Sequence, residues 1–145
     1  MDFSKKFNYV LIGPGSSGKS FFHNKLPNKI RAAKLDKIGK TFFTTPTGLV
    51  SYCSINYLPW PTMDRFVSNC SGRPIKAIVC ECPIKILRRR LTDRFFNRLP
   101  GYKKNDDYFR RAMSIFSENY NFDYSHLFEV LKSSNISYHI LDTNG

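Results

Sequence analysis

The sequence predicts an α/β fold: a three-layer sandwich in which helices cover both faces of a mostly parallel sheet of about five strands. Three observations predict it. Short apolar runs alternate along the chain with segments of helical spacing. A glycine-rich loop directly follows the first apolar run. The 145 residues, 41% hydrophobic and 15% aromatic, suffice for one core, so we expect residues 1–145 to form a single domain.

The predicted strands are short apolar runs bounded by turn residues. The four clearest are residues 7–12, 49–56, 75–82 and 137–142. Residues 30–36 fit either a strand that ends in an acid or a helical turn. Residues 41–45, Thr-Phe-Phe-Thr-Thr, have β-propensity.

Helices are predicted between these strands. The first begins at Ser20 and is stopped by Pro27. A second runs from about residue 62 to 67, with Thr62 at its N-cap. A third starts after Pro83, where an apolar stripe recurs at helical spacing at Ile84, Leu87, Leu91 and Phe95. Residues 106–132 are mostly helical by pattern, with a break near 119–123.

The loop from Gly13 to Ser20 has the complete pattern G-x-x-x-x-G-K-S. An apolar strand precedes it and a helix follows it, as a phosphate-binding P-loop requires. Glycines let the backbone turn so that successive N–H groups point at phosphate oxygens. In this motif we expect Lys19 to reach the β- and γ-phosphates and the Ser20 hydroxyl to bind Mg²⁺.

A strongly basic helix follows the strand at 75–82. Arg90, Arg94 and Arg98 are spaced four residues apart, so they share one helix face. Guanidinium groups match phosphate oxygens with paired hydrogen bonds, and they can neutralise charge on a transferring phosphoryl group. The alternatives are a solvated basic face and a helix that binds nucleic acid.

Together the P-loop, the strand that ends Glu81-Cys82-Pro83, and Arg90-Leu91-x-x-Arg94 resemble the nucleoside and nucleotide kinases, or polynucleotide kinases, of the P-loop NTPase class. The resemblance implies a nucleotide-kinase-like fold with a short lid at about residues 88–106. It implies ATP and Mg²⁺ as cofactors, with Ser20 as the metal ligand and the segment after the last strand lying against the adenine. The nucleotide-binding residues so implied are Gly13, Gly15, Ser16, Ser17, Gly18, Lys19, Ser20, Phe21, Arg90, Arg94 and Asn144.

The chain departs from these kinases in its acids. They usually carry an acid on a middle strand, and residues 49–56 contain none. A kinase that acts on a hydroxyl needs a carboxylate near the acceptor. Asp36, which follows Lys19 by 17 residues, is the first candidate for that base, and Glu81 is the second. The expected catalytic set is Lys19, Asp36, Arg90 and Arg94.

The net charge and the cysteines indicate which partners and which cellular compartment to expect. The chain has 23 Lys and Arg against 11 acids, a net charge of +12, which favours polyanionic partners such as nucleic acid. The four cysteines lack zinc-site spacing, so we expect buried free thiols in a reducing compartment. Neither a signal peptide nor a membrane-spanning run is apparent. We therefore expect the cytoplasm, that of the host for a virus or phage, and no membrane partner.

These observations predict an ATP-dependent phosphotransferase that moves the γ-phosphate to a nucleoside, nucleotide or nucleic-acid acceptor. Two alternatives remain at this point: an NTPase that couples hydrolysis to the handling of nucleic acid, and a nucleotide-binding protein without phosphoryl transfer. The absence of an apolar strand ending in Asp or Asp-Glu weighs against the NTPase, and the missing middle-strand acid keeps the non-catalytic protein in view.

Overall fold

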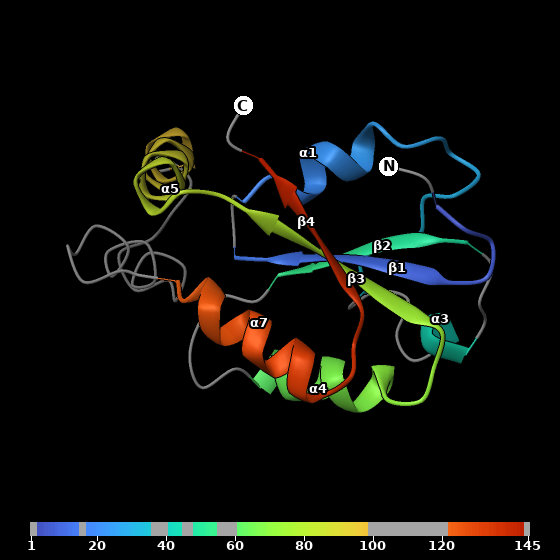
Figure 1. Cartoon of the computed structure of the whole chain (residues 1–145). Helices are drawn as coiled ribbons and strands as arrows, with labels where there is room; N and C mark the ends of the chain where they lie inside the picture. The colour runs from blue at the N-terminus through green and yellow to red at the C-terminus, as the bar shows by residue number, and fades with distance from the viewer. Residues whose placement is uncertain are drawn as a thin grey trace.

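The computed structural model describes residues 3–14, 17–35, 41–44, 48–54, 61–98 and 122–143, and for 41, 61–63, 91–92 and 94–98 it describes the backbone alone. This part of the chain forms an α/β structure with one parallel sheet (Figure 1). In chain order its elements are β1 (Asn8–Gly13), α1 (Lys19–Asn24), α3 (Thr41–Thr44), β2 (Val50–Ser54), α4 (Pro61–Cys70), β3 (Ile75–Glu81), α5 (Ile84–Arg98), α7 (Tyr124–Ser133) and β4 (Tyr138–Asp142).

The sheet has the order β2-β1-β3-β4, and every neighbouring pair is parallel. β1 is buried along its whole length, which suits an apolar strand with a neighbour on each side. Beyond β2, Arg31 forms an isolated parallel bridge with Val50, held by two backbone hydrogen bonds of 2.8 and 2.9 Å. The predicted α/β class and parallel sheet are confirmed, and the run at 30–36 contributes this bridge at the edge of the sheet.

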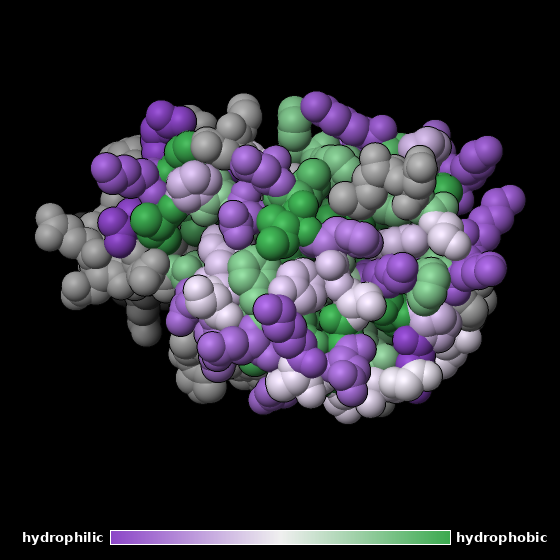
Figure 2. Space-filling view, viewed as in Figure 1, coloured by the Kyte–Doolittle hydropathy of each residue, from purple (hydrophilic) through white to green (hydrophobic). Residues whose placement is uncertain are grey.

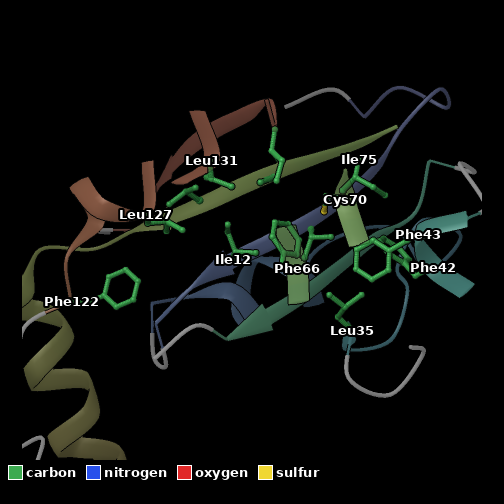
Figure 3. Packing of buried hydrophobic residues seen from close by; sticks show 14 of the residues in the cluster. Ile12, Leu35, Phe42, Phe43, Phe66, Cys70, Ile75, Phe122, Leu127 and Leu131 are labelled. Atoms are coloured by element: carbon green, nitrogen blue, oxygen red, sulfur yellow. The ribbon is translucent and has the colours of Figure 1, made fainter. Parts of the chain in front are cut away.

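Two hydrophobic clusters cover the two faces of the sheet. Val10 and Ile12 face one cluster, and the alternate residues Tyr9 and Leu11 face the other. The first cluster holds side chains from α3, α4, α5 and α7, and in it Phe66 lies between Ile12 and the aromatic rings of α3 (Figure 3). The second is covered by α1 and by the N-terminal aromatic residues. Helices therefore lie on both faces of the described sheet.

The segment at 41–44 differs from its β-propensity: it forms a single helical turn, α3. Phe42 and Phe43 are 5% and 3% exposed, and both belong to the same hydrophobic cluster. A strand would send these consecutive side chains to opposite faces, whereas a helical turn lets both enter one core. Burial of two phenylalanines therefore outweighs the β-propensity of the segment.

The other predicted helices agree in position with the structure, within its described residues. α1 ends at Asn24, before Pro27. α4 extends the helix predicted at 62–67 to Pro61–Cys70, so Thr62 is its second residue and not its N-cap. α7 begins at Tyr124, where the Asp123 side chain accepts a hydrogen bond from the His126 amide. Residues 106–121 of the helical pattern predicted at 106–132 lie outside the described residues. No helix in the described ranges combines the length and apolar character needed to cross a bilayer.

Phe66 provides a direct test of the larger cluster. Its side chain is 2% exposed and meets the Phe43 ring edge-on. We expect Phe66→Ala to lower the free energy of unfolding by about 3–5 kcal/mol, because a large cavity replaces the ring. Urea denaturation measures this change. Phe21→Ala, at a ring that is 69% exposed, is the matched control, and a loss below about 1 kcal/mol for Phe66→Ala would contradict the packing described.

Candidate phosphate-binding site

The candidate site lies where the central strands end. The strands are parallel, so the carboxyl ends of β1, β3 and β4 meet at one edge of the sheet. Gly13 is opposite Ser54 at the end of β2, and Glu81 is opposite Asp142 at the ends of β3 and β4. The loop that leaves Gly13, the start of α5 and the residue after β4 are thereby brought to the same edge.

Two glycines are required by the backbone of this loop. Gly13 has φ of 154°, and an added Cβ would lie 2.8 Å from Ser17 Oγ and 3.0 Å from the Cys80 carbonyl oxygen. Gly18 has φ of 97°, and a Cβ there would lie 3.1 Å from two carbon atoms of the Thr143 side chain. These are conformations and contacts that residues with a side chain rarely adopt. Glycine therefore allows the loop to pack tightly against both β3 and the segment after β4.

The Lys19 ammonium is buried inside this loop, and the residue is 5% exposed. Its Nζ donates to the carbonyl oxygen of Gly13 at 2.9 Å, to that of Pro14, and to Ser17 Oγ at 3.2 Å. A buried ammonium needs such partners, because loss of its hydration is costly. The loop thus gathers one positive charge at the carboxyl end of β1, where a phosphate oxygen would be attracted to it.

Thr143 joins the loop to the sheet. Its hydroxyl lies 2.6 Å from the Ser17 carbonyl oxygen and 3.0 Å from the Glu81 carbonyl oxygen, and its amide donates to the same Glu81 oxygen at 3.0 Å. Its side chain also faces Gly18. One residue after β4 therefore holds the beginning of α1 against the end of β3.

Arg90 connects α5 to this junction. One guanidinium nitrogen donates to the Thr143 carbonyl oxygen at 2.6 Å, and another donates to Cys82 Sγ at 3.4 Å. Arg90, the first arginine of the predicted row, is therefore linked to the loop through a single residue, Thr143. Arg94 and Arg98 also belong to α5, as the helical spacing predicted, and their side chains lie outside the described part.

Tyr124 anchors α7 at the same edge. Its hydroxyl donates to the Cys80 carbonyl oxygen at 2.9 Å and accepts from the Cys82 amide at 3.2 Å. These are backbone groups at the point where β3 ends. Burial raises the pKa of the Tyr124 hydroxyl, so it stays protonated and keeps both hydrogen bonds at neutral pH.

The thiols at this edge are not poised as nucleophiles. Burial raises the pKa of Cys80 to about 11, although the Lys19 charge opposes the shift. Burial also raises the pKa of Cys82, and here the Arg90 charge opposes it. Both thiols are therefore protonated at neutral pH, as expected for structural cysteines.

The described residues contain no group of three or more His, Cys, Asp or Glu that could hold a metal ion. Magnesium in phosphate sites is usually held by one or two protein oxygens together with substrate phosphates, so such a group is not required. Ser20, the second residue of α1, is exposed next to the buried Lys19, which leaves its hydroxyl accessible at the loop. Ser20 is therefore the single protein oxygen that the sequence motif assigns to a metal ion.

The structure brings together part of the predicted site. The members placed at one edge of the sheet are Gly13, Ser17, Gly18, Lys19, Ser20 and Arg90. The Phe21 ring is exposed on α1 beneath the Lys25 ammonium. Gly15, Ser16, Asp36 and Asn144 lie outside the described residues. The same holds for residues 99–106 of the predicted lid and for the side chain of Arg94.

The sequence analysis did not identify Thr143 or Tyr124. Thr143 had a positional signal, because it follows the last predicted strand and precedes Asn144. Tyr124 had none, because its contacts join residues that are 42 and 44 positions apart.

Ser51, on the strand without an acid, uses its hydroxyl to bind the Ala33 carbonyl oxygen at 2.6 Å. That contact fixes the segment after Arg31 beside β2.

In comparisons with known proteins, no protein-family model, no curated protein and no solved structure matches the chain.

The hydroxyl of Thr143 can be tested by a change of one atom type. Thr143→Val keeps the shape of the side chain but removes the hydrogen bonds to Ser17 and Glu81. We expect the free energy of unfolding to fall by about 1–3 kcal/mol and amide hydrogen exchange at residues 17–19 to accelerate. Thr143→Ser, which keeps the hydroxyl, is the control. Equal exchange in the two variants would show that the hydroxyl does not hold the loop.

Cys80 predicts a loss of stability in alkaline solution. Burial raises the pKa of the Cys80 thiol from 9.0 to about 11 in the folded chain. The contribution of this thiol to the free energy of unfolding is therefore complete below pH 9 and is lost as the pH rises toward 11. We expect Cys80→Ala to reduce the fall in unfolding free energy between about pH 9 and 10.5 by roughly 1 kcal/mol. Urea denaturation across this range measures it, with Cys53→Ala at a half-buried thiol as the control. An identical pH profile for wild type and Cys80→Ala would refute the raised pKa.

Proposed function

We propose that the chain is an ATP-dependent phosphotransferase with a P-loop, nucleotide-kinase-like fold. The observation that carries the proposal is the buried Lys19 ammonium, held inside a glycine-bounded loop at the carboxyl end of the central strand. An ammonium in that position is the group that a triphosphate requires. The acceptor of the γ-phosphate would be a nucleoside, a nucleotide or a nucleic acid.

In this proposal the loop binds the phosphates and Lys19 orients them. A phosphate oxygen offers a full negative charge, and it would replace the carbonyl oxygens of Gly13 and Pro14 as partner of the Lys19 Nζ. Because the Gly13 and Gly18 backbones are already in their required conformations, little reorganisation is needed beyond movement of this side chain.

Arg90 would supply a second positive charge. Its guanidinium already lies at the site edge through Thr143, and release of that contact would allow it to turn toward the phosphates. Such an arginine favours transfer of a phosphoryl group, because it stabilises the charge on the oxygens of that group in the transition state. Magnesium, bound with the nucleotide at Ser20, would neutralise further phosphate charge. Arg94 would extend the same row within the proposed lid at residues 88–106.

The carboxylate that would act as the base comes from outside β2. β2 carries no acid from Val50 to Ser54, so no carboxylate of this strand is available to an acceptor. We retain Asp36 as the proposed base. The segment that leads to it runs beside β2, as the contacts of Arg31 and Ala33 indicate. The same absence of an acid favours one alternative function, a nucleotide-binding protein that acts on nucleic acid without transfer to an acceptor.

Transfer of label from γ-labelled ATP separates these functions. The acceptors to be tested are nucleosides, deoxynucleoside monophosphates and oligonucleotides with a 5′-hydroxyl. We expect wild type to label at least one of them and Lys19→Ala to lose at least about 100-fold in rate, because the charge that stabilises the transferring group is gone. Lys132→Ala, at an exposed lysine on α7, is the matched control and should transfer normally.

Two outcomes of this assay would change the proposal. ATP binding without transfer to any acceptor would replace the kinase with the nucleotide-binding alternative. Full transfer by Asp36→Asn would remove Asp36 as the base while leaving the phosphotransferase in place.

A further inference from the structure

The first part of the described chain carries positive charge without any acid. Residues 3–35 contain no Asp or Glu and seven cations, Lys5, Lys6, Lys19, Lys25, Lys29, Arg31 and Lys34. Lys19 is buried in the loop, whereas Lys25 and Lys29 are exposed. A region without acids near its lysines attracts anions over more than one contact. The proposed phosphate site uses only one of these cations, so the others require a separate explanation.

Phe21 places an aromatic ring within this region. It directly follows Ser20 and is 69% exposed, whereas most large apolar residues of the described chain are buried. The neighbouring Phe22 and, one turn later, Leu26 pack onto the sheet. Phe21 and Lys25 are therefore on the outer side of α1, four residues apart, and the Lys25 ammonium lies 4.1 Å from the centroid of the Phe21 ring.

Arg31 extends this surface beyond the end of α1. Its guanidinium donates to the Asn24 carbonyl oxygen at 3.1 Å and also binds the Asn28 side chain. These contacts hold the arginine next to the last turn of the helix, with Lys29 exposed in the turn between. Figure 2 shows hydrophilic side chains along the rim of the molecule over α1 and the segment that follows it. We call Phe21, Lys25, Lys29 and Arg31 the α1 surface.

We propose that the α1 surface binds single-stranded nucleic acid, with Phe21 stacked on a base and the three cations on backbone phosphates. Proteins that bind single strands without reading sequence combine cations along the nucleic-acid backbone with aromatic rings on which bases stack. In a duplex the bases are already stacked on one another and paired, so a lone exposed ring gains little from it. An acidic protein would satisfy the cations but would leave the ring without a partner.

The position of this surface gives it a role in the reaction. Phe21 is separated from Lys19 by one residue, so a strand on the α1 surface lies next to the loop that would hold the triphosphate. The inference therefore names the acceptor class for the proposed transfer, a nucleic-acid strand, and it rests on the proposed function for that role. Binding itself does not depend on ATP.

Binding is tested by fluorescence anisotropy with a labelled single strand of about 12 nucleotides, without ATP, between about 50 and 200 mM salt. We expect Phe21→Ala to weaken binding by at least about 5-fold at every salt concentration without changing the salt dependence. Phe21→Trp should bind at least as tightly as wild type. The double variant Lys25→Gln, Lys29→Gln should reduce the slope of log K against log salt by about 1.4, because about 0.7 is lost per phosphate contact.

The matched control is Lys132→Gln on α7, which removes one exposed cation elsewhere and should keep the wild-type affinity. Two results would overturn the proposal. One is an unchanged affinity of Phe21→Ala for the single strand, combined with an affinity of the wild type for a duplex of the same length that equals its affinity for the single strand. This result would indicate general charge attraction. The other is a loss of ATP affinity alone in Phe21→Ala, which would assign the ring to the nucleotide.

Failure of this inference and failure of the proposed function give different results. Tight strand binding by wild type and by Lys19→Ala, with no transfer by either, would refute the kinase and leave the α1 surface intact. Transfer to nucleosides without any strand binding would refute the surface and leave the kinase intact.

Discussion

Burial of the Lys19 ammonium constrains the whole carboxyl edge of the sheet. The charge can leave water only if oxygen atoms surround it, and the loop supplies them from Gly13, Pro14 and Ser17. To bring those oxygens together the backbone must fold back on itself, which fixes glycine at positions 13 and 18. The loop continues directly from β1, which is buried along its length between two neighbouring strands.

The closure of this edge depends on contacts that are remote in sequence. Thr143 reaches the loop across 126 residues, and Tyr124 reaches the end of β3 across more than 40. Each contact uses a side-chain hydroxyl to satisfy backbone groups, those of the loop for Thr143 and those at the end of β3 for Tyr124. The last strand and α7 must therefore be in place before the loop is fully held, so the binding site is a product of the complete fold and not of the glycine-rich segment alone.

Local pattern was enough to predict β1, the loop and α5, because each depends on its own periodicity and on glycine or proline at its ends. The parallel sheet also followed from the alternation of apolar runs and helices. Pattern failed at Phe42 and Phe43, where the neighbouring core, and not the residues themselves, selects a helical turn. It also missed Thr143 as a structural contact, since its position after the last strand does not reveal that its hydroxyl meets the Ser17 carbonyl oxygen, 126 residues away.

The chain places two kinds of positive charge side by side, and they differ in what they can bind. Lys19 is enclosed and has partners whose replacement by an anion is geometrically defined, so it suits a fixed phosphate. Lys25 and Lys29 are exposed, so they suit a ligand whose phosphates repeat and need no single position. Phe21 stands between the two on α1, and an exposed ring is retained more readily where a base can cover it. An enclosed charge for one phosphate group, next to exposed cations for several, is the arrangement that the proposed transfer from a nucleotide to a nucleic-acid strand would need.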